Sequence, residues 1–384
     1  MILKNRFFLF FIFCACFCVV VFDLFYLFPG IKQTYLRGET SAQIDDFNFF
    51  NTRSVLAPSP KPLPLASNYL DSLENDSLLN MLNSIETSAF LVIKDDSVRL
   101  EKYWDDGGLD SLSNSFSIAK SIVSLLVGCA IDSGYIKSVN QSIFDFLPEL
   151  SPYKNHDVKI RHLLNMSSGF DWLENYKKPI SVTAKAYYGD DLFSVLLRRG
   201  FTEAPGVTYR YNSGNTQLLG FILSRSTGKS VSDFASEVLW SKIGASNNAA
   251  WSLDSKNGFE KTFCCFNSSA RDFSKIGLLM LSSGRGVISE GYFNWLLSAP
   301  LLINGENPSK QVDFYSNGWW AASVLNHTIY YARGFLGQYV VFIPELNVVF
   351  VRLGRSEDGF ENIENYMLTN SLDFIIRMVI KDFS

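Results

Sequence analysis

The sequence predicts an α/β protein of the α+β type, with an antiparallel sheet flanked by helices and a large, mostly helical insertion. Apolar residues alternate in the manner of strands near residue 90 and again in the C-terminal part of the chain, so the sheet is assembled from both ends of the sequence. Between them, over about residues 130–300, apolar residues recur at helical spacing. An apolar run at the N-terminus adds a predicted transmembrane helix.

The composition indicates a folded protein with a large core. The chain has 384 residues, of which 47% are hydrophobic and 15% aromatic, enough for one large domain or two. Its formal net charge is −4, so it lacks the excess of positive charge that neutralises nucleic-acid phosphates. We therefore expect no nucleic-acid partner.

Residues 1–30 are predicted to be a membrane anchor. Residues 7–28 are apolar with one acidic exception, and this length matches the roughly 20 residues that cross a bilayer core. Lys4 and Arg6 precede the run and favour a cytoplasmic N-terminus, with the main domain on the extracytoplasmic (periplasmic) side. A cleavable signal peptide fits less well, because its apolar region is usually shorter and is followed by a small-residue cleavage site. Lipid attachment to Cys16 is a further alternative.

Residues 31–84 are predicted to be a linker that ends in a lead-in helix. Proline occupies alternate positions from Pro58 to Pro64, a pattern that favours an extended, semi-rigid spacer between membrane and domain. A loop lying on the domain surface is the alternative. Apolar residues at helical spacing predict the lead-in helix at residues 78–85.

Residues 85–384 are predicted to form the main domain. Two strands joined by a turn are expected at residues 89–93 and 98–104, followed by a buried helix that begins at Ser117 and stops near Gly134. Further helices are predicted at residues 160–166, 191–199, 216–227, 231–240 and 270–281. The remaining strands are predicted at residues 319–324, 328–333, 338–343 and 348–353, with a terminal helix at 361–382.

Cysteine and histidine usage indicates neither a disulfide framework nor a metal site. Three of the six cysteines lie in the apolar run, Cys129 lies in a predicted helix, and Cys264 and Cys265 are adjacent. Only three histidines occur, without a C-x-x-C or H-E-x-x-H pattern. We expect neither a metal nor a cofactor.

Ser117 and Lys120 form the first candidate catalytic group. They occupy positions i and i+3, which a helix places on one face with Cβ atoms about 5–6 Å apart. A serine hydroxyl becomes a good nucleophile when a base takes its proton, and a desolvated lysine loses enough basicity to act as that base. The spacing alone also occurs by chance, so an ordinary helix with an exposed lysine is the alternative.

Other motifs follow in a defined order along the chain: His162 to Gly169 (HLLNMSSG), Tyr211-Asn212-Ser213, and Gly334 to Gln338 (GFLGQ) between two strands. Together with Ser117-x-x-Lys120 they resemble the serine β-lactamase and DD-peptidase superfamily over about residues 85–384. The likeness is greatest to its class C-like branch, with the 6-aminohexanoate-dimer hydrolases and related esterases. The resemblance implies a β-lactamase/DD-peptidase-like fold and cleavage of an amide or ester through an acyl-enzyme.

The resemblance also implies a role for each motif. Ser117 would attack the acyl carbonyl, Lys120 would accept its proton, and Tyr211 would relay a proton to the leaving group. The backbone N–H groups of Ser117 and Gln338 would bind the oxyanion, and Gly337 would let the backbone approach the substrate.

Two departures from the family pattern bear on the substrate. Ser213 stands where many relatives have asparagine, so a hydroxyl replaces the amide that contacts substrate. Phe335 stands where relatives commonly have a lysine or histidine, which favours neutral amides, esters or peptides over penicillin-like acids. Trp172 is a candidate for the border of the substrate cleft, with packing in the core as the alternative.

The preferred hypothesis is a membrane-anchored serine hydrolase that acts on a small-molecule or peptide substrate. The alternative is a non-catalytic, penicillin-binding-like protein that uses the same cleft to bind a ligand. A hydrolase with a Ser-His-Asp triad is disfavoured, because the chain contains no G-x-S-x-G motif.

Overall fold

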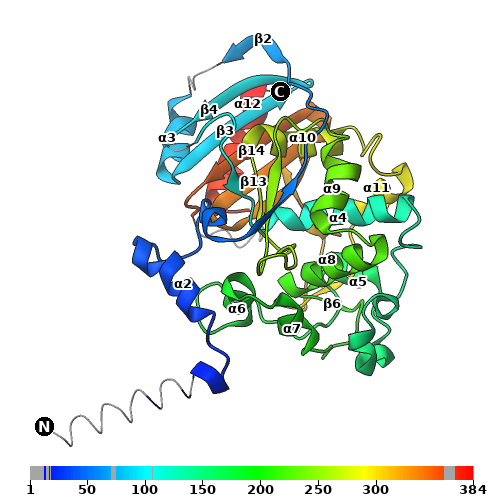
Figure 1. Cartoon of the computed structure of the whole chain (residues 1–384). Helices are drawn as coiled ribbons and strands as arrows, with labels where there is room; N and C mark the ends of the chain where they lie inside the picture. Colours follow the sequence, from blue (N-terminus) through cyan, green and yellow to red (C-terminus); the bar gives the residue numbers. More distant parts are fainter. Residues whose placement is uncertain are drawn as a thin grey trace, which may run out of the picture.

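A central sheet of eight strands organises the molecule (Figure 1). The structure is a computed structural model that describes Phe13, Phe17 and residues 19–70, 75–105, 107–358 and 368–383. In spatial order the strands are β10 (Tyr315–Ser316), β11 (Trp319–Val324), β12 (His327–Gly334), β13 (Gln338–Ile343), β14 (Val348–Gly354), β3 (Thr87–Lys94), β4 (Ser97–Tyr103) and β2 (Leu65–Leu70). Neighbours pair antiparallel except β2 and β4, which are parallel. Strands from both ends of the chain therefore meet, as the sequence predicts.

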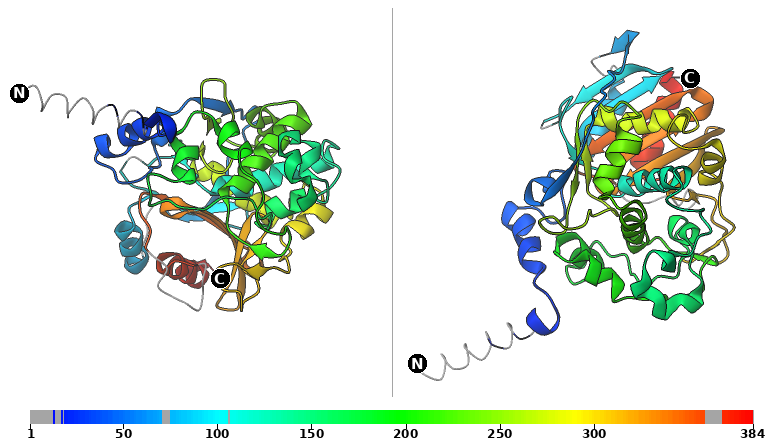
Figure 2. Two further views of the ribbon diagram at one scale, coloured as in Figure 1. Left: turned by 90° about the horizontal axis from the view of Figure 1, so that it is seen from below. Right: turned by 45° about the vertical axis from the view of Figure 1, so that its right-hand side comes forward.

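Each face of this sheet has its own core, because successive side chains of a strand point to opposite faces. On β13, Val340 and Phe342 belong to the larger core, and Val341 and Ile343 belong to the smaller one. Helices α3 (Asp76–Ser84) and α12 (Asn370–Phe383) cover the smaller core. Helices α4 (Ile118–Asp132), α8 (Ser213–Thr227) and α10 (Ala270–Leu281) contribute to the larger core, and Figure 2 shows them on the opposite side of the sheet from α12.

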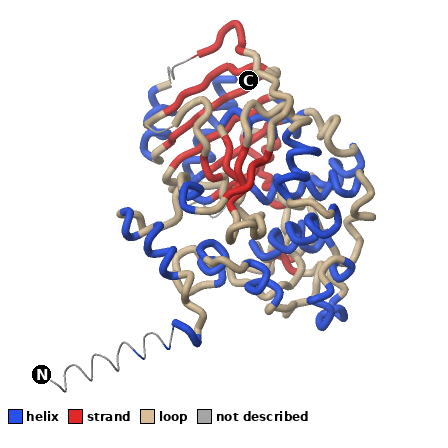
Figure 3. The backbone as a smooth tube through the Cα atoms, viewed as in Figure 1, coloured by secondary structure: helices blue, strands red, loops and turns tan. Residues whose placement is uncertain are grey.

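The insertion predicted at about residues 130–300 is mostly helical, as Figure 3 shows, but it also contains short strands. Besides α8 and α10, its α-helices are α5 (Ile160–Leu164), α6 (Val182–Tyr188), α7 (Leu192–Leu197), α9 (Val231–Ala235) and α11 (Glu290–Leu296). A second sheet has the order β1 (Thr52–Val55), β7 (Ala249–Ser252), β8 (Phe266–Ser268) and β5 (Ser113–Asn114). A parallel pair joins β6 (Thr208–Tyr209) to β9 (Ile303–Asn304).

The terminal helix begins later than the sequence predicts. Helix α12 starts at Asn370. The predicted helix 361–382 also includes Leu368 and Thr369, which are not helical, so the prediction is wrong at these two residues. Residues 361–367 of that prediction lie outside the described residues. The side chain of Asp358 accepts a hydrogen bond of 2.8 Å from the Ser371 backbone N–H. A carboxylate at this end of a helix satisfies a free backbone donor and fixes the start.

The predicted linker is largely part of the folded domain. Strand β1 pairs antiparallel with β7, and its Val55 is fully buried. The proline-rich segment then runs along the surface to β2, and the Lys61 N–H donates to the Gly244 carbonyl at 3.0 Å. The spacer prediction is therefore wrong for this segment, and the surface-loop alternative describes it.

The described part of the predicted membrane span ends earlier than expected. Residues 7–12, 14–16 and 18 lie outside the described residues, and no helix within the described residues has the length and apolarity to cross a membrane. The helical turn at residues 19–21 stops before Asp23, which has a φ of 50° and pairs with Lys185 at 2.5 Å. A separate helix, α2 (Leu27–Gln33), follows and packs against α6. The predicted continuous helix to residue 28 is therefore interrupted.

Candidate active site

Ser117 lies directly before α4, at the point where the small sheet meets this helix. Strand β5 pairs with β8, and the Ser115 N–H donates to the Phe266 carbonyl at 2.9 Å. Phe116 then adopts a φ of 44°. Such a positive φ is unusual for a bulky residue, and backbone conformations of this kind are found most often at functional sites. The side chain of Asn114 accepts the Phe116 N–H at 3.0 Å. These contacts fix the turn that presents the Ser117 hydroxyl.

Lys120 is one helical turn further on, with its amine against Ser117. Its Nζ lies 2.8 Å from the Ser117 Oγ and donates to the Phe263 carbonyl at 2.8 Å. The residue is only 4% exposed. Burial lowers the pKa of the Lys120 amine to about 8, although the negative charge of Glu174 opposes this shift. A large fraction of the amine is therefore uncharged near pH 8 and is able to accept a proton.

Tyr211 completes a compact group with Ser117 and Lys120. The Lys120 Nζ lies 5.1 Å from the centroid of the Tyr211 ring. Burial raises the pKa of the Tyr211 phenol above its usual value, and a side-chain hydrogen bond with Ser117 partly opposes that rise. The structure thus brings together the three residues that the sequence predicts as catalytic.

Ser213 and Trp172 meet a carboxylate that the sequence analysis missed. Glu174 accepts the Ser213 N–H at 2.8 Å, the Ser213 hydroxyl at 2.9 Å and the Trp172 indole N–H at 2.9 Å. Ser213 lines the cavity that contains Ser117, whereas Trp172 packs in the larger core. Trp172 is thus better described by the packing alternative than as a cleft residue. Glu174 belongs to no motif, so no spacing in the sequence marked it.

The third motif differs from its predicted arrangement. Strands β12 and β13 form a hairpin in which Gly334 pairs with Gln338, so Phe335 lies in the turn and Gln338 is already back in the sheet. Gln338 is fully buried, and its amide donates to the Gly354 carbonyl at 2.6 Å. Phe335 lines the cavity beside Ser117, while Gly337 and Gln338 are not among its lining residues. The structure therefore does not place Gln338 as the predicted second oxyanion donor.

The turn that carries Phe335 is held by close backbone packing. A Cβ on Gly334 would lie 2.1 Å from the Ser115 carbonyl oxygen, so the hairpin backbone lies directly against the segment before Ser117. Behind the turn, the buried Arg352 donates to the Leu336 carbonyl at 2.7 Å and the Gly337 carbonyl at 2.9 Å. Gly337 has a φ of 74°, and a Cβ there would lie 2.5 Å from the Arg352 guanidinium. Gly337 thus makes room for Arg352, and its predicted role toward substrate stays a prediction.

A cavity opens beside Ser117 between the catalytic group and the N-terminal segment. Its walls come from α2 and the residues after it, the loop at residues 175–179, α6, and Phe335. Tyr176 in that loop stacks on Phe335 with ring centroids 5.7 Å apart. No group of three metal-ligating side chains gathers anywhere in the described ranges.

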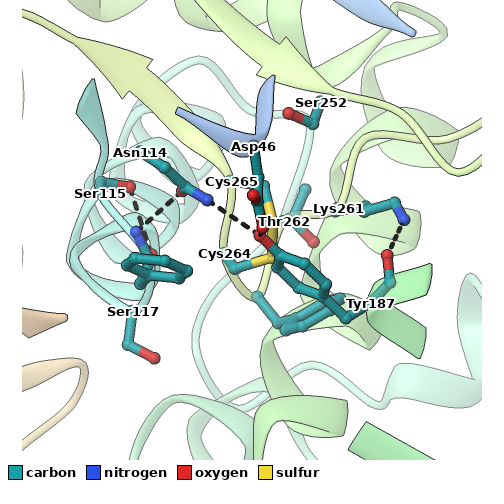
Figure 4. Close-up of a disulfide and its surroundings, with 12 residues drawn as sticks. Asp46, Asn114, Ser115, Ser117, Tyr187, Ser252, Lys261, Thr262, Cys264 and Cys265 are labelled. Carbon is teal, nitrogen blue, oxygen red and sulfur yellow. Dashed lines mark hydrogen bonds between the residues drawn. A yellow bond between two sulfur atoms is a disulfide. The ribbon is translucent and has the colours of Figure 1, made fainter. Parts of the chain in front are cut away.

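A disulfide between the adjacent Cys264 and Cys265 borders the same cavity (Figure 4). Cys264 lines the cavity and directly follows Phe263, whose carbonyl contacts Lys120. The Cys264 carbonyl accepts the Trp251 indole N–H at 3.0 Å. The sequence analysis excluded only a framework that staples distant segments, and it did not anticipate a bond between neighbours.

The order of these elements matches a known family. A family model described as Beta-lactamase matches residues 78–370. The chain belongs to the beta-lactamase family. A curated relative, the 6-aminohexanoate-dimer hydrolase of Paenarthrobacter ureafaciens, is 25% identical over 291 residues, or 71% of this chain and 73% of that protein.

Solved structures of the beta-lactamase family share the fold. A Bacillus anthracis protein assigned as a 6-aminohexanoate-dimer hydrolase has a TM-score of 0.66 at 19% identity, over 91% of this chain and 93% of that one. A family VIII carboxylesterase has a TM-score of 0.62 at 17% identity, over 81% of this chain and 98% of the other. The β-lactamase-like fold and the membership in a family of hydrolases predicted from the motifs are confirmed.

Proposed function

We propose that this protein is a membrane-anchored serine hydrolase that cleaves an amide or ester through an acyl-enzyme on Ser117. One observation carries the proposal: the buried Lys120 Nζ lies 2.8 Å from the Ser117 Oγ. Within such a distance an uncharged amine takes the hydroxyl proton as the oxygen attacks. The hydrolase and esterase relatives of the same family support this reading of the geometry.

The proposed reaction has two halves. Ser117 Oγ bonds to the acyl carbon while Lys120 accepts its proton, and Tyr211 passes its own proton to the leaving nitrogen or oxygen as that bond breaks. The proton held on Lys120 then restores the Tyr211 phenol. A water molecule then attacks the Ser117 ester by the reverse proton path and releases the acid. We assign oxyanion binding to the Ser117 N–H at the start of α4 and to the backbone of Phe335, because the hairpin turn lies against the segment before Ser117.

Anchoring and location belong to the same proposal. Residues 7–21, before the break at Asp23, are all apolar, and Lys4 and Arg6 precede them. This pattern supports an anchor with a cytoplasmic N-terminus and a domain on the periplasmic side. Phe335 stands where relatives commonly have a lysine or histidine, and the absence of this cation supports neutral amides, esters or peptides over penicillin-like acids.

The chemistry is tested by covalent labelling with a fluorophosphonate and by hydrolysis of p-nitrophenyl acetate. The wild-type protein is expected to be labelled and active, and Ser117→Ala is expected to lose both. Lys120→Ala and Tyr211→Phe are each expected to lower the acylation rate by about 10²-fold or more, because each removes a proton-transfer group. A wild-type protein that is neither labelled nor active would favour the ligand-binding alternative.

A further inference from the structure

Large apolar side chains are exposed together at the corner where the N-terminal segment meets the loop before α6. We call these residues the apolar rim, and each is at least 45% exposed: Phe22, Phe25, Phe28, Ile31, Tyr35, Leu36, Leu173, Tyr176 and Ile180. Soluble proteins rarely expose apolar side chains in contiguous groups of this kind, and such groups usually mark a contact with a partner or a membrane.

The two segments that carry the rim are joined to each other. The Tyr26 hydroxyl donates to the Pro179 carbonyl at 3.2 Å, and Asp23 pairs with Lys185 at 2.5 Å. Helices α2 and α6 are in contact, and Figures 1 and 2 show them side by side. The rim is therefore one surface held on a fixed part of the domain.

Helix α2 has apolar residues on the face that the domain does not cover. The inner side of α2 packs against the domain. A Cβ added at Gly30 would lie 3.3 Å from the Tyr188 ring, and Gln33 is buried. Phe28 and Ile31 of α2 lie three residues apart and are 61% and 45% exposed, and Phe25, just before the helix, is 55% exposed. The fold buries only the inner side of the helix. An apolar outer stripe of this kind is typical of a helix that lies against a membrane or a partner.

Part of the rim borders the cavity that contains Ser117. Ile31, Tyr35 and Tyr176 are exposed members of the rim that also line this cavity. A molecule that reaches Ser117 along this path therefore passes between apolar side chains.

Basic side chains accompany the rim. Lys32, Lys177 and Lys178 are exposed, and none of them forms an ion pair within the described part of the chain. The chain as a whole carries a net charge of −4, so this local set is opposite in sign to the molecule. Lysines near an anionic lipid surface each contribute about 1 kcal/mol of attraction.

We propose that the apolar rim docks on an anionic lipid bilayer and that Ser117 cleaves amphiphilic esters or amides whose apolar chain enters the cavity from the bilayer. The inference about the substrate rests on the proposed function. The bonds formed and broken are those of the proposed acyl-enzyme reaction, and water is the only co-reactant. A bilayer is favoured over a second protein copy because the apolar sequence of residues 7–21 leads directly into this corner. The lysines beside the rim match anionic headgroups.

Docking is tested by lysine footprinting of the full-length protein in vesicles that contain phosphatidylglycerol, with a water-soluble amine-acylating reagent read by mass spectrometry. Lys32, Lys177 and Lys178 are expected to react several-fold more slowly with vesicles than without them, because the bilayer excludes the water-soluble reagent, and the exposed Lys154 is expected to react at the same rate in both samples. The double variant Phe28→Glu/Leu36→Glu is expected to lose this protection, and the matched control Leu301→Glu, 89% exposed outside the rim, is expected to keep it. Equal reactivity with and without vesicles in the wild type, or protection that depends on protein concentration and not on lipid, would overturn docking.

The substrate class is tested by comparing p-nitrophenyl decanoate with p-nitrophenyl acetate. The wild type is expected to have a kcat/KM at least about tenfold higher for the decanoate, since each buried CH₂ contributes about 0.8 kcal/mol. Ile31→Asp is expected to reduce that ratio. Hydrolysis of the acetate without a preference for the decanoate would overturn the amphiphile inference and leave the hydrolase standing. Failure on both esters would instead contradict the proposed function, and the lysine footprint would still decide the docking.

Discussion

The charge of Glu174 affects the pKa of Lys120, the proposed general base. Glu174 holds Ser213 and Trp172 through three hydrogen bonds, and its negative charge raises the pKa of Lys120 against the larger effect of burial. A general base works in its uncharged form, so kcat/KM is expected to rise as the pH rises through the Lys120 pKa of about 8. Glu174 therefore sets where that rise occurs.

Replacing Glu174 with glutamine is expected to move this rise in kcat/KM to lower pH. The neutral amide no longer stabilises the charged form of Lys120, so the amine loses its proton at a lower pH. The measurement is a pH profile of kcat/KM with p-nitrophenyl acetate. Ser213→Ala is the matched control, because it removes one hydrogen bond and keeps the charge. A profile that stays in place or moves to higher pH in Glu174→Gln would contradict this role.

The side chains that carry the chemistry were predictable from the sequence to different extents. Ser117 and Lys120 were predictable because helical spacing alone brings them together, and Tyr211 because its motif follows in the family order. The place of Gln338 in the hairpin was not predictable, because it depends on the pairing register, which the letters GFLGQ do not specify. Glu174 was missed because its partners become neighbours only when the insertion folds.

The turn at residues 263–265 holds the amine of Lys120 in position through a backbone carbonyl. Phe263 contributes the carbonyl that accepts from Lys120, and the disulfide of Cys264 and Cys265 follows it immediately. Backbone hydrogen bonds hold the far side, where the Ser252 N–H donates to the Cys265 carbonyl at 2.9 Å. The disulfide thus restricts the part of the turn that faces the cavity.

Opening this disulfide is expected to lower the acylation rate by about tenfold. A dithiol would convert Cys264 and Cys265 to thiols and would itself be oxidised, and the freed turn would hold the Phe263 carbonyl less firmly against Lys120. Misplacement of catalytic groups by about 1 Å costs up to about 10²-fold in rate. The measurement is fluorophosphonate labelling before and after reduction, with thiol titration to show that the bond has opened.

The matched control for the disulfide is the double variant Cys264→Ser/Cys265→Ser. It is expected to label slowly from the start and to be insensitive to the dithiol. Rapid labelling by this variant, or by a wild type in which the thiols are free, would show that the disulfide does not position Lys120.

Among the helices and strands, periodicity worked best where one face is buried. Helix α10 and strand β13 have the predicted bounds, because their apolar residues match one helical face or a doubly buried strand. Strands β1 and β2 were missed. Their sequences, TRSV and LASNYL, are largely exposed, so pairing with β7 and β4 forms them without an apolar signal.

The N-terminal part of the chain is integrated into the whole molecule. Strand β1 adds an edge to the small sheet, β2 adds one to the large sheet, and α2 forms a wall of the cavity. The division into anchor, linker and domain predicted from the sequence stays a prediction for the first residues. From about residue 19 onward the structure joins these parts.

Two truncations are expected to separate the anchor from the fold. Deletion of residues 1–18 is expected to change the Tm by no more than about 2 °C, because the folded domain keeps its strands. Deletion of residues 1–56 removes β1 with the fully buried Val55, a loss of about 2 kcal/mol or more that is expected to lower the Tm by about 3 °C or more. The measurement is thermal unfolding followed by circular dichroism. An equal Tm for both truncated proteins would show that β1 does not contribute to stability.

The backbone contacts that hold the Phe335 turn have a consequence for how substrate preference can vary among proteins with this fold. Arg352 and Gln338 grip the turn through its carbonyl groups, and Gly334 rests on the Ser115 backbone. None of these contacts involves the side chains of Phe335 or Leu336. Exchange of those two side chains would therefore leave the hydrogen bonds of the turn backbone in place, while it would change the cavity wall at Phe335 and its packing on Phe116. Related proteins could thus vary the substrate preference at this turn and keep its backbone support.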